Sequence, residues 1–429
     1  MSGALYRIKA ALIVLIILVV VDIYAYQAIR IATSRLTKIL KHTTRGLYWS
    51  ITAFTVCIFV WLHTIGIPNE KLREWILISL GIIYFSKLFL IAVLIVDDLR
   101  RGVHLSRRFY KRRRNPQIEE NVERISRSEF FAKAALVSWA IPLTSLSFGI
   151  ISGAHNFQVR RRTIYLPHLP KSFDGILIGQ LSDIHAGSLF NKTAIRGGVE
   201  MLMQEKPDIV FFTGDLVNGE TEEVNDYINV FDKIKAPHGV YSVTGNHDYG
   251  NYRGWSSEAA KRKNFEDMLA AHRQMGYDLL MNENRIIELQ GEKLAILGVE
   301  NWGIGPPLRF PKYGKLKDAH ANTDEASVKI LLSHDPTHWD AQIRPEFPDI
   351  DITFAGHTHG YQLGVNIGNF SWSPAQYRFK QWAGLYQEGN QYIYVNRGFG
   401  CIGYPGRIGM PPELTIIELK RGNAKPEIV

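Results

Sequence analysis

Polar residues with metal-ligand chemistry follow five apolar runs in the C-terminal two-thirds of the chain. A single Asp or His at a strand end is usually a turn or cap residue, because its short side chain hydrogen-bonds to the local backbone. Five strand ends carry Asp, Asn or His here, and burying so many polar groups together without a metal would be costly. We therefore expect a metal centre. Its candidate residues are Asp183 and His185 in LSDIHAG, Asp215 in FTGDLVNG, Asn246 and His247 in VTGNHDYG, His334 in LLSHDP, and His357 and His359 in FAGHTHG.

The spacing of these residues suits a shared site. In the D-x-H and H-x-H pairs, alternate side chains of an extended segment point the same way, so both members of a pair can reach one cluster. Mixed nitrogen and oxygen donors suit Mn, Fe or Zn rather than Ca. Glycines, which permit tight turns and close backbone approach, stand beside the candidates at Gly214, Gly245, Gly356 and Gly360.

The elements that must position these residues are the apolar runs themselves. Each run has the length of a strand and is followed by a polar turn and often by a helical stretch, which is typical of an α/β domain. The expected strands are Gly175–Leu181, Asp208–Thr213, Gly239–Thr244, Lys293–Val299, Val328–Ser333, Asp351–Ala355, Tyr392–Asn396 and Leu414–Leu419.

The five blocks resemble a known family, the calcineurin-like metallophosphoesterases, whose signature is D-x-H, G-D, G-N-H-D/E, H and G-H-x-H in this order. The resemblance covers about residues 173–420. The segment NRGFGCIGYPGRIGMPPEL also resembles the YkuE-type branch of membrane-associated bacterial members. The resemblance implies a four-layer α/β/β/α sandwich, with two mixed sheets, helices outside them and a site for two divalent metal ions across one edge.

The resemblance also implies a role for each residue. His247 matches the position near the leaving-group oxygen, where it would donate a proton or stabilise the transition state, and Asp248 would orient it. Arg397 is a candidate contact of the substrate phosphate, with a surface ion pair as the alternative. Asp183, His185 and His359 would bind one metal ion, Asn246, His334 and His357 would bind the other, and Asp215 would bridge the two.

Hydrolysis of a phosphomonoester, phosphodiester or pyrophosphate by a metal-activated water follows from such a site. The alternative is a non-catalytic, membrane-tethered metal-binding scaffold or sensor, against which the intact ligand set argues. Residues 155–429 carry 29 Lys and Arg against 32 Asp and Glu, so no basic field attracts nucleic acid. A membrane tether favours a lipid-linked or envelope substrate.

The N-terminal region, residues 1–154, is predicted to cross a membrane. It holds four apolar stretches, each close to the roughly 20 residues that span a bilayer core of about 30 Å. The first lacks a small-residue cleavage pattern, so we expect a retained helix rather than a signal peptide. Residues 155–172 are predicted to form a polar connector, and residues 173–429 the phosphoesterase domain. The expected spans are about residues 10–29, 48–67, 75–96 and 131–153.

Lys and Arg gather in two of the expected loops, between Arg30 and Arg45 and between Arg100 and Arg114. Short basic loops stay on the cytoplasmic side of a membrane. The phosphoesterase domain, which follows the fourth span, is therefore expected on the extracytoplasmic face, periplasmic or extracellular. Arg7 and Lys9 oppose this orientation.

Two ionisable residues, Asp22 and Lys87, interrupt the first and third apolar stretches. Each lies twelve residues from the predicted outer end of its helix. An unpartnered charge at that depth costs several kcal/mol, so we expect the two to pair. The alternative is that their side chains reach out to the membrane surface.

Overall fold

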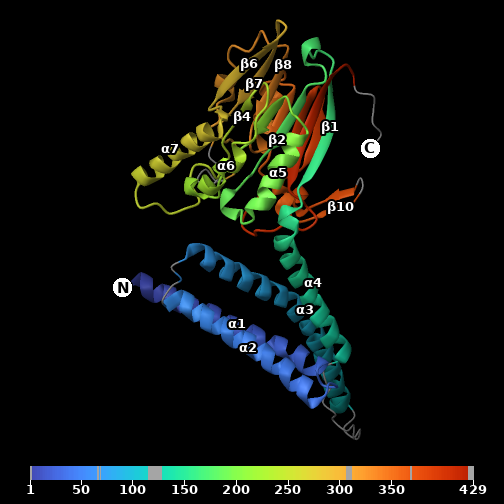
Figure 1. The fold of residues 1–429 in the computed structure, drawn as a ribbon. Helices are drawn as coiled ribbons and strands as arrows, with labels where there is room; N and C mark the ends of the chain where they lie inside the picture. The colour runs from blue at the N-terminus through green and yellow to red at the C-terminus, as the bar shows by residue number, and fades with distance from the viewer. Residues whose placement is uncertain are drawn as a thin grey trace. The chain divides into compact units, whose positions relative to one another are not determined.

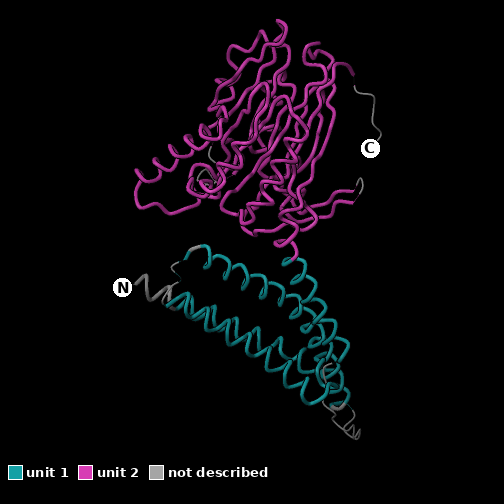
Figure 2. Tube along the Cα trace, viewed as in Figure 1, with its two compact units in different colours: residues 1–147 teal, residues 148–429 magenta. Residues whose placement is uncertain are grey.

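The computed structural model describes residues 2–64, 67, 69–114, 128–305, 312–367 and 370–423. The chain divides into two compact units, residues 1–147 and residues 148–429, shown in teal and magenta in Figure 2.

Long apolar helices build the first unit. Leu12, Ile16 and Val20 on the first helix are each more than half exposed, as expected of side chains that face lipid. A helix satisfies its own backbone hydrogen bonds, which the interior of a bilayer requires. Within the described residues, four helices are long and apolar enough to cross a membrane. They are α1 (Ser2–Ala32), α2 (Lys38–Thr64), α3 (Glu70–Arg114) and α4 (Glu129–Ile151), labelled in Figure 1.

The third helix is longer than the sequence predicted. The sequence predicts that the apolar span ends at Val96 and that a basic loop follows. In the structure α3 continues to Arg114, and the whole helix has 45 residues. Arg, Lys and Leu favour helix in water, so the chain keeps its helical form after the apolar stretch ends. Residues 115–127 are polar and charged in the sequence, which predicts a cytoplasmic loop or surface helix, and they lie outside the described residues.

The predicted pairing of Asp22 with Lys87 is confirmed. Both side chains are buried, and the Lys87 Nζ atom forms an ion pair with the Asp22 carboxylate. The Tyr84 hydroxyl donates to Asp22 Oδ2 at 2.9 Å, and the Tyr48 hydroxyl donates to the Asp22 backbone oxygen at 2.8 Å. The network connects α1, α2 and α3.

Two six-stranded mixed sheets form the centre of the second unit as the structure describes it. The first has the order β1 (Gln158–Leu166), β14 (Glu413–Arg421), β2 (Leu177–Leu181), β3 (Ile209–Phe212), β4 (Val240–Ser242) and β5 (Asp278–Leu279). The second has the order β12 (Gly384–Glu388), β13 (Gln391–Val395), β9 (Ile352–Ala355), β8 (Val328–Leu332), β7 (Glu292–Gly298) and β6 (Glu283–Leu289). A separate small sheet pairs β10 (Val365–Ile367) with β11 (Phe370–Trp372).

The parallel strands explain where polar side chains meet. Strands β2, β3 and β4 run parallel in the first sheet, and β7, β8, β9 and β13 run parallel in the second. Their carboxyl ends therefore gather at an edge of each sheet, where loops can bring ligands together.

Alternating side chains divide the second unit into layers. Phe211 packs between the two sheets, whereas its neighbour Phe212 packs against the helices outside the first sheet. Successive residues of a strand point to opposite faces, so one strand supplies both cores. The outer helices are α5 (Lys192–Gln204), α6 (Ile228–Phe231) and α7 (Glu258–Met275) on the first sheet, with α8 (Leu316–His320) and α9 (Arg344–Glu346) on the side of the second. The predicted four-layer α/β/β/α sandwich is confirmed.

All eight predicted strands occur, and the segment predicted as a polar connector contains one further strand. Within residues 155–172, Gln158–Leu166 form β1, which pairs with β14 in parallel from Gln158 opposite Glu413 to Leu166 opposite Arg421. This strand lies at the edge of its sheet, and Arg160 to Arg162 are partly or fully exposed. Charged residues protect an edge strand from pairing with other chains, and here they concealed its strand pattern.

Candidate metal centre

The predicted ligands come together at the carboxyl ends of five strands. Asp183 and His185 follow β2, and Asp215 follows β3. All seven predicted metal ligands are buried except His357, which is half-buried. The remaining members are Asn246 after β4, His334 after β8, and His357 and His359 after β9.

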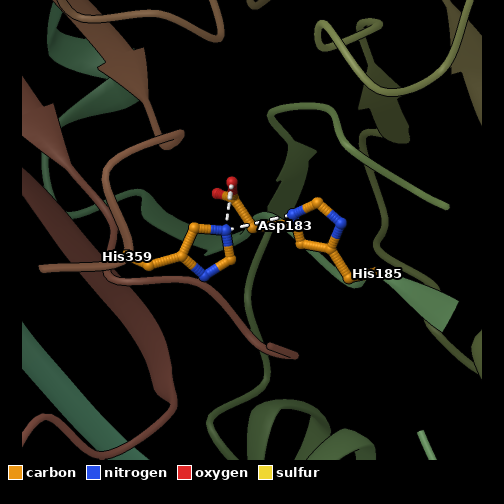
Figure 3. A group of neighbouring side chains, drawn as sticks. All are labelled: Asp183, His185 and His359. Carbon is orange, nitrogen blue, oxygen red and sulfur yellow. Dashed lines mark hydrogen bonds and ion pairs between the residues drawn. The ribbon is translucent and has the colours of Figure 1, made fainter. Parts of the chain in front are cut away.

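One group of ligand atoms consists of Asp183, His185 and His359, drawn in Figure 3. The His359 Nε2 atom lies 3.1 Å from Asp183 Oδ1 and 3.0 Å from His185 Nε2. The three side chains come from two loops and point toward one another. They offer two imidazole nitrogens and a carboxylate oxygen to a common point.

A second group consists of Asp215, His334 and His357, with Asn246 beside it. His334 Nε2 lies 3.1 Å from Asp215 Oδ2 and 3.3 Å from His357 Nδ1. His357 Nδ1 is also 2.9 Å from Asn246 Oδ1.

The Asp215 carboxylate lies between the two groups. Its Oδ2 atom is 3.1 Å from His334 Nε2 in the second group and 3.5 Å from His185 Nε2 in the first. A single oxygen atom thus approaches a nitrogen of each group, which is the position that a bridging ligand requires.

These donors fit divalent metal ions. Nitrogen and oxygen ligands lie about 2.0–2.2 Å from such an ion, so two ligands at right angles are about 3 Å apart. The 3.0 Å contact between the Nε2 atoms of His185 and His359 has this spacing. A hydrogen bond would use the lone pair of only one nitrogen, whereas a shared cation would use both.

The backbone at the ligands is strained. Non-glycine residues rarely adopt positive φ angles, and each such residue costs on the order of 1–3 kcal/mol unless its surroundings impose the conformation. Strain of this kind concentrates at functional sites. Five of the candidate ligands have left-handed φ angles: Asp183 (51°), His185 (44°), Asp215 (57°), His357 (70°) and His359 (52°).

Two glycines allow the backbone to approach the carboxylates. A Cβ atom on Gly245 would lie 2.1 Å from Asp215 Oδ1, and one on Gly356 would lie 2.2 Å from Asp183 Oδ2. Any side chain at either position would therefore displace a ligand.

Hydrogen bonds from the backbone fix the ligand orientations. His334 Nδ1 donates to the Thr213 carbonyl oxygen at 2.7 Å, which leaves Nε2 to act as the ligand atom. The His357 backbone N–H lies 3.0 Å from both carboxylate oxygens of Asp183. The Asn246 Nδ2 atom donates to the Tyr252 hydroxyl at 2.7 Å, so that Asn246 Oδ1 faces the cluster.

The buried carboxylates make the potential at His334 negative. Burial opposes protonation of His334, but the charges of Asp215 and Asp183 outweigh it and raise the pKa of His334 to about 10. Burial, and then the charge of Asp215, raise the pKa of Asp248 to about 7. Divalent cations would balance this potential.

Family comparisons assign both units. A family described as "Probable Calcineurin-like phosphoesterase, transmembrane domain" matches residues 7–154, and "Calcineurin-like phosphoesterase" matches residues 176–361. Together the two matches cover more than half of the chain. The chain belongs to the calcineurin-like phosphoesterases. It is an integral membrane protein and a phosphoester hydrolase.

Similar proteins occur in bacteria and animals. The phosphoesterase is 29% identical over 272 residues to the uncharacterized metallophosphoesterase YkuE of Bacillus subtilis, covering 63% of this chain and 87% of the relative. It is 29% identical to a transmembrane protein with metallophosphoesterase domain from Danio rerio, covering 64% of this chain and only 60% of that relative. A solved dimetal phosphatase from Danio rerio overlaps with 53% of this chain and 88% of its own, at 11% identity and a TM-score of 0.33. That overlap is too weak to carry an inference.

His247 lies beside the candidate ligands of the phosphoesterase and is half-buried. Its ring stacks on Tyr252 with centroids 4.0 Å apart, and its backbone N–H donates to Asp215 Oδ1 at 2.9 Å. His247 Nδ1 donates to the Asn218 carbonyl oxygen at 2.7 Å. The predicted orienting partner was Asp248, so that assignment is corrected in favour of Asn218.

Asp248 instead holds the loop that carries Asp215. Its carboxylate accepts hydrogen bonds from the backbone N–H groups of Gly245 at 2.8 Å, Asp215 at 3.0 Å and Leu216 at 2.8 Å. Asp248 is therefore a positioning residue for the Asp215 loop.

Arg397 has a buried acidic partner. Its guanidinium is buried and forms an ion pair with Glu413 at 2.5 Å. Glu413 is fully buried and also accepts from the Tyr394 hydroxyl at 2.7 Å. The ion pair that the sequence offered as the alternative is present, but it is buried rather than at the surface; the substrate contact stays a prediction.

Two further residues contact the candidate ligands, although neither was predicted as a ligand or a catalytic residue. Tyr252 contacts both Asn246 and His247, as described above. Arg407 is buried, donates to the Gly398 backbone oxygen at 3.1 Å, and lies 3.3 Å from His359 Nδ1. Tyr252 follows the GNHD block closely in the sequence, and this proximity could have indicated its contact with the site. The contact of Arg407 with His359 is long-range, and the local sequence gives no signal of it.

Proposed function

We propose that this phosphoesterase hydrolyses a phosphomonoester, phosphodiester or pyrophosphate with two divalent metal ions of the Mn, Fe or Zn class. The observation that carries the proposal is the Asp215 Oδ2 atom, which approaches nitrogens of both ligand groups. One ion would be held by Asp183, His185 and His359, the other by Asn246, His334 and His357, with Asp215 between them.

Bound divalent ions supply two kinds of chemistry, since they lower the pKa of a bound water and stabilise charge on phosphoryl oxygens. The protein contributes orientation. The Asn218 carbonyl fixes the His247 ring through Nδ1, so Nε2 is the nitrogen that can give a proton to the leaving-group oxygen. Asp248 keeps the Asp215 loop in place through the backbone.

The membrane helices favour a lipid-linked or envelope substrate, because they keep the site near a bilayer. Basic residues support an extracytoplasmic location of the catalytic unit. They gather between Arg30 and Arg45 and near the C-terminal end of α3, and such segments stay in the cytoplasm. A cysteine added to the surface of the catalytic unit tests on which side of the membrane this unit lies. In intact cells it should react with a membrane-impermeant maleimide. A cysteine that reacts only after lysis would place the catalytic unit in the cytoplasm.

Turnover of bis-p-nitrophenyl phosphate with added Mn tests the enzymatic proposal. The wild type should be active, and His247→Ala and Asp215→Asn should each lose activity. An inactive wild type that holds two metal ions would instead favour the non-catalytic scaffold or sensor.

A further inference from the structure

The β10–β11 hairpin presents an apolar face. Val365 lies opposite Trp372 in the register, and Ile367 lies opposite Phe370. Directly opposed residues of an antiparallel pair share a face, and alternate residues of a strand do too. The four side chains therefore lie on one face, while Asn366 and Ser371 lie on the other.

This apolar face is exposed. Ile367 is 72% exposed, Phe370 61% and Val365 39%, and Leu363 just before the hairpin is 46% exposed. On the opposite face Asn366 and Ser371 are only partly exposed, and the Ser371 hydroxyl oxygen is shielded from solvent. The usual arrangement in water, with polar residues outward, is reversed.

The hairpin is joined to the end of a membrane helix within the second unit. The Gly364 backbone N–H donates to the Ile408 oxygen at 2.9 Å at the base of the hairpin. The preceding residue, Arg407, donates its backbone N–H to the Gly149 oxygen at 3.1 Å in the last turn of α4. Since α4 carries a candidate membrane span, the bilayer surface must come close to this end of the unit. Figure 2 shows the chain entering the magenta unit at this end.

The residues that follow the hairpin suit a membrane surface. Tyr377, at the end of the short helix Pro374–Tyr377, is 79% exposed, and Arg378 beside it is also exposed. Tyr and Trp rings gather at the headgroup level of bilayers, and basic side chains there contact lipid phosphates.

We propose that the apolar face of the β10–β11 hairpin inserts into the interface of the bilayer that the helices cross. Ile367, Phe370 and Val365 enter the boundary between headgroups and acyl chains, with Tyr377 and Arg378 at headgroup level. His359, a candidate metal ligand, lies six residues before Val365. If the proposed phosphoesterase function holds, the hairpin therefore brings lipid headgroup phosphates to the metal centre.

Site-specific fluorescence quenching in the full chain tests the insertion. Cys57 is exposed and is replaced by Ala, whereas the buried Cys401 is kept. The environment-sensitive dye NBD is then attached to Ile367→Cys or, separately, Phe370→Cys, and the protein is reconstituted in phosphatidylcholine–phosphatidylglycerol vesicles. A fraction of the lipids carries a doxyl quencher near the headgroup end of the acyl chain.

Two matched labels provide the controls. Asn366→Cys lies on the opposite face of the same hairpin, and Ile286→Cys lies on β6, where the native side chain is 40% exposed. An inserted face lies within roughly 10 Å of the headgroup boundary, so quenching at positions 367 and 370 should exceed that at position 286 at least about twofold. Position 366 should give an intermediate value.

Equal quenching at positions 367, 370 and 286 would overturn the proposal. Cross-linking between copies through position 367, without quenching by lipid, would assign the face to a second copy of the chain and overturn it too. The quenching needs no catalytic activity, so a failed phosphoesterase assay with strong quenching would remove the proposed function and leave the insertion standing.

Discussion

The membrane unit and the catalytic unit each bury a group of charged side chains, but the two groups handle their charge differently. In the membrane unit the Asp22 carboxylate pairs with the Lys87 ammonium. In the catalytic unit the Asp183 and Asp215 carboxylates are surrounded by imidazoles, and their field raises the pKa of His334 to about 10. The first group is neutral as it stands, whereas the second calls for added positive charge.

The backbone repeats this contrast. Asp22 and Lys87 lie within regular helices. Asp183, His185 and Asp215 have left-handed φ angles of 51°, 44° and 57°. A balanced pair stabilises the packing of helices, while strained, unbalanced ligands indicate that the fold positions them for a bound species. Buried carboxylates thus form an ion pair in one unit and belong to a cluster of candidate metal ligands in the other.

Asp215→Asn should produce the largest effect, because it removes charge from the carboxylate whose Oδ2 atom lies within 3.5 Å of a nitrogen of each ligand group. We expect more than the 10–100-fold loss of activity or metal affinity typical of residues behind the ligands. Elemental analysis and bis-p-nitrophenyl phosphate turnover measure both quantities. If the Asp215→Asn variant kept two metal ions and near-normal turnover, the proposed contrast between the Asp22–Lys87 pair and the carboxylates of the catalytic unit would be wrong.

His247→Ala should lower kcat by about 10²–10⁴-fold, the usual contribution of a positioned proton donor. Metal content should stay at the wild-type level, because His247 contributes no atom to either group of ligands. Steady-state kinetics combined with elemental analysis checks the result. A parallel loss of metal would make His247 a ligand or a structural residue.

Asp22→Ala should destabilise the membrane unit by roughly 3–5 kcal/mol, because it leaves Lys87 buried without its partner. Unfolding in mixed micelles measures the change. Metal binding by the catalytic unit should be unaffected.

The exchange of Asp22→Lys with Lys87→Asp in one chain should recover part of the lost stability. No recovery would show that the tyrosine hydroxyls or the helix geometry, rather than the ion pair, set the stability of this group.

Asp248→Asn should have the smallest effect, a loss of about 10–100-fold in metal affinity or turnover. In the native loop the Asp248 carboxylate accepts hydrogen bonds from backbone N–H groups. The amide of the variant would place its NH₂ group, a donor, against one of these donors, so that hydrogen bond would be lost. Metal titration under controlled chelation measures the change. An unchanged affinity would show that the backbone alone holds Asp215 in place.

Local sequence predicted that the candidate ligands would lie together because each of them follows a buried strand, and parallel strands end at a common edge. The same reasoning could not identify the partner of Arg397, since Glu413 comes from a distant strand and meets it only through sheet pairing. The orientation of His247 by Asn218 was missed for a related reason, because a backbone carbonyl leaves no mark on residue type. The strand at Gln158–Leu166 was also missed, because its exposed arginines break the alternation.

Anomalous diffraction from crystals of the full chain, prepared with Mn and collected on both sides of the metal absorption edge, tests the central claim most directly. The account predicts two metal peaks, one among Asp183, His185 and His359 and the other among Asn246, His334 and His357, with the Asp215 carboxylate in contact with both. A single peak, or peaks away from Asp215, would contradict it.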